Sequence, residues 1–524
     1  MDKPDIIFIV LDTQRADRLG AYGHARAFTP NLDAFAEQAI LFEQAISPAQ
    51  WTVPSHASLF TGLYPTAHQV TQSSQSLSQD IPHLAEVLAA NGYQTVGFCN
   101  NPLVGVLNNG FKRGFQTFYN YGGAFPSLPE KSTTLPGPLN AIAARYSQFL
   151  RRISYPIQNF FGQSDLAFRL SLNSWTTPLW SRFANFKGQN ERSVRDVARF
   201  LRQQEKQEGE RPLFLFLNLM ETHLPFRPPS PFIDKTAPYF RRSREAREIM
   251  AAWNREAYRW AAPLEEPLGE LESRVLNDLY DAEVAYQDDY LGELLEVIDG
   301  RSPHRPTLTI IVSDHGDGLG EHGYFGHAFV AYQELVHVPL IIHWPDQFPQ
   351  PQRIAAPVST RRIYHTILDA AGHLPDLPNL DPVSIHGLTL AHTMRGSDPE
   401  NSTAYSEIIP PLNFVRAIEN RQPHLLEPFR CLSERRAVVK TSGDEAFKLI
   451  EIENDPAELF NLTSDPLELE EQMGERPYLA QSLHEEIQGM TARVTRQQET
   501  LRAGDEIELN DSMRQQLRAL GYIE

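Results

Sequence analysis

Five short, largely apolar segments limit the fold of this chain more than any other feature of its sequence. The segments span residues 6–11, 93–99, 212–220, 306–314 and 338–345. Continuous apolar runs that are rich in β-branched residues are typical of strands buried on both faces of a sheet. Strands of this kind occur mainly in parallel sheets that carry helices on both sides.

Amphipathic helical patterns separate these segments. Residues 29–42 begin with Thr-Pro, which is typical of a helix start, and residues 81–93 end with a Gly shortly after Asn, which is typical of a helix end. Residues 193–207 and 277–299 are amphipathic as well. Strands that alternate with helices predict an α/β fold with one large, mostly parallel sheet flanked by helices.

Changes in composition predict two domains, 1–395 and 396–524. Two stretches of the first domain, about 120–187 and 226–270, are rich in aromatic residues, proline and arginine, and we expect them to form lid insertions over the active face. Beyond residue 395, short apolar segments between turn signals predict a smaller C-terminal subdomain with an antiparallel sheet and terminal helices. The basic, amphipathic stretch 145–161 favours an ordinary lid helix, with contact to a lipid or an acidic ligand as the alternative.

The charge of the chain narrows its range of partners. It carries 66 acidic and 47 basic residues, for a net charge of −19. Because an acidic surface does not attract nucleic acid, we expect no nucleic-acid partner. Two cysteines cannot build a disulfide framework, and there is no signal-peptide core or apolar run of about 18 residues. These features predict a cytoplasmic protein and leave its oligomeric state open.

Polar side chains stand where the predicted strands end. Asp12 ends the first strand, and Asp314 and His315 end the fourth. Thr52 opens the segment WTVPSHASLFTG, whose many small residues indicate a strand-to-helix elbow. Because the carboxyl ends of parallel strands share one edge of the sheet, we expect these side chains to meet. Two carboxylates, an imidazole and a hydroxyl suit a divalent cation, which would also favour a Thr52 alkoxide.

Two further histidines extend this group. His223 follows the third strand, and His327 follows the glycine-rich loop 316–323. Either imidazole can bind an anion or protonate a departing oxygen. Each residue alone has a plainer interpretation: Thr52 as a helix cap, Asp12 as a strand-end carboxylate and His223 as a hydrogen-bonded core histidine. The hypothesis of a site depends on all the ligand candidates coinciding at the strand ends.

Several segments together resemble the sulfatase family of the alkaline phosphatase superfamily. In chain order they are PDIIFIVLDTQRADRLGAYG, TPNLDAFAEQAILFEQAI, WTVPSHASLFTGLYPTAH, NLMETHLPF, LYDAEVAYQDDYLGELL, VSDHGDGLGEHGYFGH and, near the C-terminus, DPAELFNLTSDPLE. The resemblance implies a mixed sheet flanked by helices, a small C-terminal antiparallel sheet, and a metal-assisted hydrolase of sulfate or phosphate esters.

The resemblance also implies a role for each position that matches a motif of the family. The implied metal ligands are Asp12, Thr52, Asp314 and His315. The implied catalytic residues are Thr52, as the nucleophile, together with His223 and His327. The implied substrate-binding residues are His56, Asn100 and Asn101.

The sequence departs from the sulfatase pattern at the nucleophile and at the metal site. Sulfatases place Cys or Ser, followed by x-Pro-x-Arg, where this chain has Thr52 and His56, and they oxidise that Cys or Ser to formylglycine. Oxidation of a threonine would give a ketone instead of the required aldehyde. Thr13 replaces a second early aspartate, and His315 replaces the usual asparagine. The nitrogen ligand favours Mn²⁺ or Zn²⁺, with Ca²⁺ and Mg²⁺ as alternatives. A single site is expected, because Glu221 and His223 do not complete a second set of ligands.

These departures favour phosphorus over sulfur chemistry. The leading hypothesis is a metal-dependent hydrolase of phosphate diesters, or of phosphate or phosphonate monoesters, that forms a covalent phosphothreonine. Three alternatives remain: a sulfatase that works without formylglycine, a phospho-alcohol transferase, and a degenerate relative that only binds anions. The expected substrate is a small phosphate, phosphonate or sulfate ester.

Overall fold

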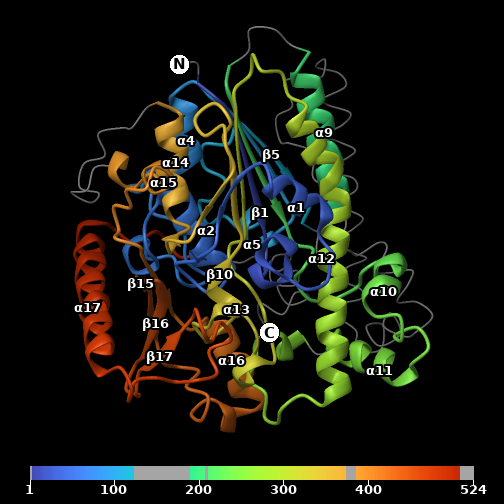
Figure 1. Ribbon diagram of the computed structural model, residues 1–524, viewed down its shortest axis with the longest axis vertical. Coiled ribbons are helices and arrows are strands. Elements are labelled where there is room, and N and C mark those ends of the chain that lie inside the picture. Colours follow the sequence, from blue (N-terminus) through green and yellow to red (C-terminus); the bar gives the residue numbers. More distant parts are fainter. Residues whose placement is uncertain (1–2, 123–188, 207–210, 256, 373–384, 508–524) are drawn as a thin grey trace.

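The chain folds around a large central sheet (Figure 1). A computed structural model describes residues 3–122, 189–206, 211–255, 257–372 and 385–507. In pairing order, the strands of this sheet are β12 (Gln352–Ile354), β2 (Ile40–Phe42), β11 (Leu340–His343), β7 (Thr307–Val312), β1 (Asp5–Leu11), β6 (Leu213–Leu219), β4 (Gln94–Cys99) and β5 (Thr117–Asn120). β11 runs antiparallel to β2 and β7, and the other pairs are parallel. The predicted, mostly parallel α/β sheet is confirmed.

The central strands are buried on both faces of the sheet, as their continuous apolar sequences require. β1 places Ile6, Phe8 and Val10 in one hydrophobic core. Ile7 and Ile9 point to a second core on the opposite face. Burial of one such side chain contributes about 1.5–3 kcal/mol, so a polar residue within either strand face would be costly.

Helices cover both faces of the sheet. One face packs against α1 (Pro30–Ala36), α9 (Asn190–Gln204), α10 (Ser230–Thr236), α11 (Arg244–Trp253) and α12 (Glu270–Asp299). The other face packs against α2 (Thr52–Thr61), α3 (Pro65–His68), α4 (Leu84–Ala90), α5 (Pro102–Gly105), α14 (Arg362–Ala370) and α15 (Leu390–Met394). Figure 1 shows α9 and α12 side by side along the first face. Of the helices described, none is both long and apolar enough to cross a membrane.

Short elements connect these layers. The 3₁₀ turns are η1 (Ala16–Arg18), η2 (Gly20–Tyr22), η3 (Ala257–Ala261), η4 (Glu321–Gly323), η5 (Ile385–Leu388) and η6 (Pro423–Leu425). A small sheet joins β10 (His337–Val338), β3 (Ala45–Ile46) and β13 (Val358–Ser359), and β8 (Gly318–Leu319) pairs with β9 (Phe325–Gly326). Two further helices are α13 (Gln333–Val336) and α16 (Leu412–Arg421).

Beyond residue 395 the chain forms an antiparallel sheet. Its neighbouring strands are β14 (Thr403–Ile408), β15 (Arg435–Ser442), β16 (Glu445–Ile452) and β17 (Glu458–Asn461). The helix α17 (Pro477–Thr500) lies against β15 and β16 (Figure 1). Apolar side chains of this sheet belong to the same hydrophobic core as those beneath the central sheet. The predicted C-terminal antiparallel sheet is confirmed, and the division of the chain into domains at residue 395 stays a prediction.

One of the two expected insertions reaches the neighbourhood of His327. Residues 123–188, which include the basic stretch 145–161, lie outside the described residues. The second insertion, 226–270, supplies α10, α11 and η3. η3 packs so closely on β9 that a Cβ on Gly326 would lie 1.6 Å from the Trp260 carbonyl oxygen, and the φ of +77° at Gly326 also favours glycine.

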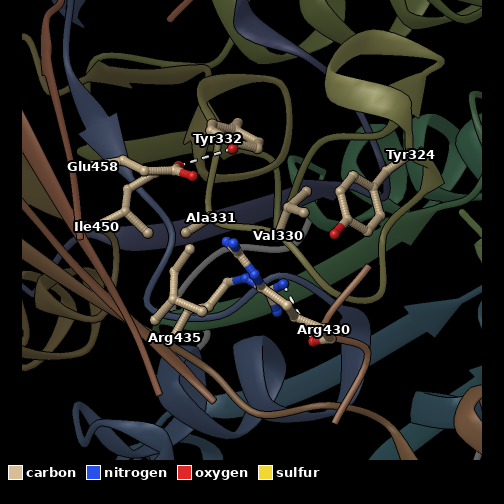
Figure 2. A pocket seen from close by; sticks show the side chains of 9 residues that line it. Tyr324, Val330, Ala331, Tyr332, Arg430, Arg435, Ile450 and Glu458 are labelled. Atoms are coloured by element: carbon tan, nitrogen blue, oxygen red, sulfur yellow. Dashed lines mark hydrogen bonds between the residues drawn. The ribbon is translucent and has the colours of Figure 1, made fainter. Parts of the chain in front are cut away.

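The loop that carries His327 is held against the C-terminal sheet. Figure 2 shows the pocket at this contact, where Tyr332 donates a hydrogen bond of 2.8 Å to Glu458. Deeper in the contact, the fully buried Lys448 ammonium lies 2.8 Å from the fully buried Glu468 carboxylate. The same Glu468 side chain accepts a hydrogen bond from the backbone N–H of Gln333. We call Lys448, Glu458 and Glu468 the C-terminal clamp.

His322 makes the stability of this contact depend on pH. Its Nδ1 lies 3.0 Å from Glu334 Oε1, and its ring stacks on Tyr332 with centroids 3.7 Å apart. Burial lowers the pKa of His322, but the hydrogen bond and charge of Glu334 outweigh burial and raise this pKa to about 9. Because an unfolded histidine has a pKa of about 6.5, the stabilisation is complete below that pH and is lost as the pH rises through about 9.

We therefore expect His322→Asn to destabilise the protein by about 3 kcal/mol more at pH 6 than at about pH 10. Asparagine suits the test because it tolerates the φ of +53° at this position. Urea unfolding of wild type and variant at both pH values measures the effect. An equal loss of stability at both pH values would contradict the assignment of a protonated His322.

Candidate metal centre and nucleophile

The carboxyl ends of β7, β1, β6 and β4 lie next to one another at one edge of the central sheet, because these strands are parallel neighbours. Asp12 follows β1 directly, and Asp314 and His315 follow β7. Thr52 is the first residue of α2. The structure brings together the four side chains that the sequence placed at these strand ends and at the elbow.

The four side chains surround one small volume. Ligand atoms of Asp12, Asp314 and His315 all lie within 4.8 Å of one another. His315 Nε2 is 3.5 Å from Asp314 Oδ2, 4.0 Å from Asp12 Oδ1 and 3.3 Å from Thr52 Oγ1. All four residues are fully buried.

The charges of this group fit a bound cation. Burial and the neighbouring charge of Asp314 raise the pKa of Asp12 well above its usual value. Burial also acts to raise the pKa of Asp314, but His315 and His56 outweigh it and lower that pKa. Among the described residues, no donor reaches Asp12 Oδ1. A buried carboxylate oxygen without a partner is costly, and a divalent cation with oxygen and nitrogen ligands would remove that cost.

The hydroxyl of Thr52 faces this volume and does not cap α2. Trp51 is the N-cap residue, with an extended backbone, and it makes no side-chain capping bond. The Thr52 hydroxyl instead lies between His315 Nε2 and Asn101 Nδ2, which is 3.5 Å away. The first turn of α2 starts at the same place, so its backbone N–H groups and helix dipole favour an anion there.

The two adjacent asparagines have different surroundings. Asn101 follows β4 and donates from Nδ2 to Asp12 Oδ2, so it joins Asp12 to Thr52. Asn100 turns away and donates to Ser193 Oγ at the start of α9. Only Asn101 of this pair therefore contacts the candidate centre.

His56 lies behind the centre. It is fully buried in α2, its Nδ1 is 3.0 Å from the Thr52 carbonyl oxygen, and the same nitrogen is 3.3 Å from Asp314 Oδ2. Its Nε2 lies 3.4 Å from the amide of Asn218 in β6. His56 is thus placed to orient Asp314 and the first turn of α2, and its ring packs near Phe216.

Three imidazoles form a row that starts at the centre. The ring of His315 lies 4.6 Å from that of His327, which lies 5.1 Å from that of His223. Burial lowers the pKa of His315 to about 4, of His327 to about 4 and of His223 to about 3. His223 Nδ1 donates to the Leu224 carbonyl oxygen. His223 and His327 therefore add imidazole nitrogen atoms to the site, in addition to the His315 nitrogen that contacts Thr52.

Two residues of this region were not predicted from the sequence. Asp317 Oδ1 lies 2.8 Å from His327 Nδ1, and Asn218 Oδ1 accepts a hydrogen bond from the backbone N–H of Asn101. Burial raises the pKa of Asp317 to about 7. The signal for Asp317 was its place between Gly316 and Gly318 in the loop after β7.

Comparison with known proteins finds relatives over most of the chain. A family model described as Sulfatase matches residues 4–373. An arylsulfatase of Clostridium perfringens is 24% identical over 500 residues, which cover 93% of this chain and 95% of the relative. The phosphonate monoester hydrolase of Agrobacterium radiobacter has a similar structure, with a TM-score of 0.61 at 20% identity over 94% of this chain and 96% of the other. The phosphonate monoester hydrolase of Silicibacter pomeroyi has a TM-score of 0.60 at 19% identity, over 94% of this chain and 96% of the other.

Proposed function

The chain belongs to the sulfatase family of ester-bond hydrolases, and we propose that it hydrolyses phosphate or phosphonate esters through a covalent phosphothreonine at Thr52. The contact of the Thr52 hydroxyl with His315 at 3.3 Å, beside Asp12 and Asp314, carries this proposal. A hydroxyl at the start of a helix, beside these candidate metal ligands, supports a nucleophile of the alcohol type.

Enzymes of the family depend on a metal, and four residues here would hold it: Asp12, Thr52, Asp314 and His315. When bound, the cation supplies positive charge that favours the Thr52 alkoxide and neutralises phosphoryl oxygens. The imidazole of His315 favours Mn²⁺ or Zn²⁺, with Ca²⁺ and Mg²⁺ as alternatives. The close pair of carboxylates also explains why a cation is needed before both can be ionised together.

Two displacements at phosphorus complete the reaction. In the first, the Thr52 oxygen forms a bond to phosphorus and the bond to the departing alcohol oxygen breaks. In the second, water attacks the same phosphorus, the bond to Thr52 breaks, and the threonine is restored. Asn101 would orient the Thr52 hydroxyl, and His223 and His327 would contact the transferred group or the oxygen opposite Thr52.

The residue type at position 52 argues for phosphorus instead of sulfur. The sulfatase route requires an aldehyde hydrate, whose second oxygen expels the sulfate, and threonine cannot provide one. A phosphothreonine needs only in-line attack by water, which metal and histidines can assist. The solved structures with this fold include phosphonate monoester hydrolases as well as a sulfatase, so the fold serves both substrate classes.

A substrate panel tests the proposal. Purified protein is assayed on nitrophenyl phosphate, bis-nitrophenyl phosphate, a nitrophenyl ester of phenylphosphonate and nitrophenyl sulfate, each with added Mn²⁺ or Zn²⁺. We expect one of the three phosphorus esters to be hydrolysed fastest. Sulfate turnover far above all three would support the sulfatase that works without formylglycine, an alternative that the name of the Clostridium relative favours. Product that forms only with an added acceptor alcohol would indicate a transferase.

A further inference from the structure

Asp317 and His327 form a buried pair beside the candidate centre. Asp317 Oδ1 lies 2.8 Å from His327 Nδ1, and the two residues are 1% and 3% exposed. Asp317 comes from the glycine-rich loop after β7, while His327 follows β9. The pair therefore connects the beginning and the end of one segment, which starts beside His315.

The pair leaves one nitrogen of His327 available. Because Nδ1 faces Asp317, only Nε2 can contact another group, and no described residue hydrogen-bonds to this buried atom. A polar nitrogen that is buried without a partner is costly unless a ligand atom or water occupies its position during function.

The surroundings of Asp317 direct its carboxylate to His327. The nearby Arg15 guanidinium donates to the backbone carbonyl oxygen of Asp317, and it pairs its charge with Asp17 and Glu321. Further ionisable groups near Asp317 are His223, His315, Asp12 and Tyr280. An ordinary structural ion pair between Arg15 and Asp317 is therefore not what keeps this carboxylate in place.

We propose that Asp317 is a positioning residue that holds His327 with the Nε2 lone pair directed to the water that hydrolyses the phosphothreonine. This inference depends on the proposed function. In-line displacement places the attacking water opposite the Thr52 oxygen. His315 Nε2 lies 3.3 Å from the Thr52 hydroxyl, and the His315 ring lies 4.6 Å from the ring of His327, so His327 is next to the group that surrounds the nucleophile.

Groups of the site accept both the proton and the electron pair that this step releases. As the water oxygen forms its bond to phosphorus, one water proton moves to His327 Nε2, and the bond between phosphorus and the Thr52 oxygen breaks. The Thr52 oxygen keeps the electron pair of that bond. The Asp317 carboxylate, through its hydrogen bond to Nδ1–H, stabilises the imidazolium that forms, which later returns its proton to solvent.

The test separates the two displacements in Asp317→Ala and Asp317→Asn. Rapid-quench assays with the phosphorus ester of the panel that wild type hydrolyses fastest measure nitrophenol release in the first turnover and in the steady state, and intact-protein mass spectrometry measures the adduct on Thr52. We expect Asp317→Ala to slow steady-state turnover about 10²-fold or more, with little change in the first turnover, so that the adduct accumulates. Asp317→Asn, whose amide oxygen can accept from Nδ1–H, should restore part of the rate.

Glu321→Gln is the matched control. It also removes a carboxylate from this loop, but that carboxylate pairs with Arg15. We expect it to leave the ratio of the two half-reaction rates unchanged. Metal content is measured for every variant. Equal slowing of both half-reactions, lower turnover without adduct, or loss of metal in Asp317→Ala would overturn the inference. If Thr52→Ala keeps full activity, or wild type turns over none of the three phosphorus esters of the panel, the proposed function fails first and the inference with it.

Discussion

Thr52→Ala is expected to lower kcat for the best phosphorus ester by about 10³-fold to 10⁶-fold, while the protein stays folded. The substitution removes the oxygen that forms the covalent bond, and water cannot occupy its place with the same orientation at the start of α2. Steady-state kinetics measures the loss, and mass spectrometry of quenched reactions should show no adduct on the variant.

The same helix offers a matched control. Thr61 is the last residue of α2 and is buried. Its hydroxyl donates a hydrogen bond to the Ala57 carbonyl oxygen. Thr61→Ala therefore removes an equivalent buried hydroxyl at a cost of about 1 kcal/mol in stability, with kcat close to that of wild type. Thr52→Ser should keep substantial activity, because it preserves the hydroxyl. Near-normal turnover by Thr52→Ala would rule out the covalent route.

Removal of divalent cations is expected to abolish turnover and to lower the melting temperature. A cation present at about 100 times its dissociation constant stabilises the folded protein by about 2.7 kcal/mol, because it binds the folded state. Without it, Asp12 and Asp314 cannot both stay ionised in a fully buried site, and Asp12 Oδ1 has no partner among the described residues. Dialysis against a chelator, followed by return of Mn²⁺ or Zn²⁺, measures the loss and recovery of both properties.

Asp12→Asn tells whether the cation is bound at this centre. The variant removes one carboxylate charge and should bind the cation weakly, so a chelator should change its melting temperature much less than that of wild type. It should also be inactive with or without added metal. A chelator effect of wild-type size in the variant would place the stabilising cation elsewhere in the protein.

The central sheet could be predicted because burial on both faces leaves a local sequence signal. Each apolar run became a strand, and the alternation with helices gave the layers. The segment 29–42 shows where local reasoning stops. Its apolar residues fit a single helix, yet α1 ends at Ala36 and Ile40–Phe42 form β2, because β11 and β12 offer hydrogen-bonding edges on both sides. Those partner strands lie about 300 residues away in the sequence, so no local sequence pattern indicates the pairing.

The candidate site was predictable to the extent that strand ends determine it. Asp12, Asp314 and His315 follow parallel neighbouring strands, so topology alone brings them together. Side-chain direction was not predictable: Asn100 and Asn101 are adjacent in sequence, but only Asn101 turns to the centre. Asp317 went unnoticed because its partner, His327, is placed by the pairing of β8 with β9.

The C-terminal clamp has a consequence for the order in which the molecule is made. Every residue of the candidate site precedes Ala328, so a ribosome synthesises the whole set before it reaches β14. The loop that carries His327 is nevertheless held by Lys448, Glu458 and Glu468, which are synthesised more than a hundred residues later. We expect a nascent chain to acquire activity only after Glu468 has left the ribosome, because the loop that carries His327 is not held in place before then.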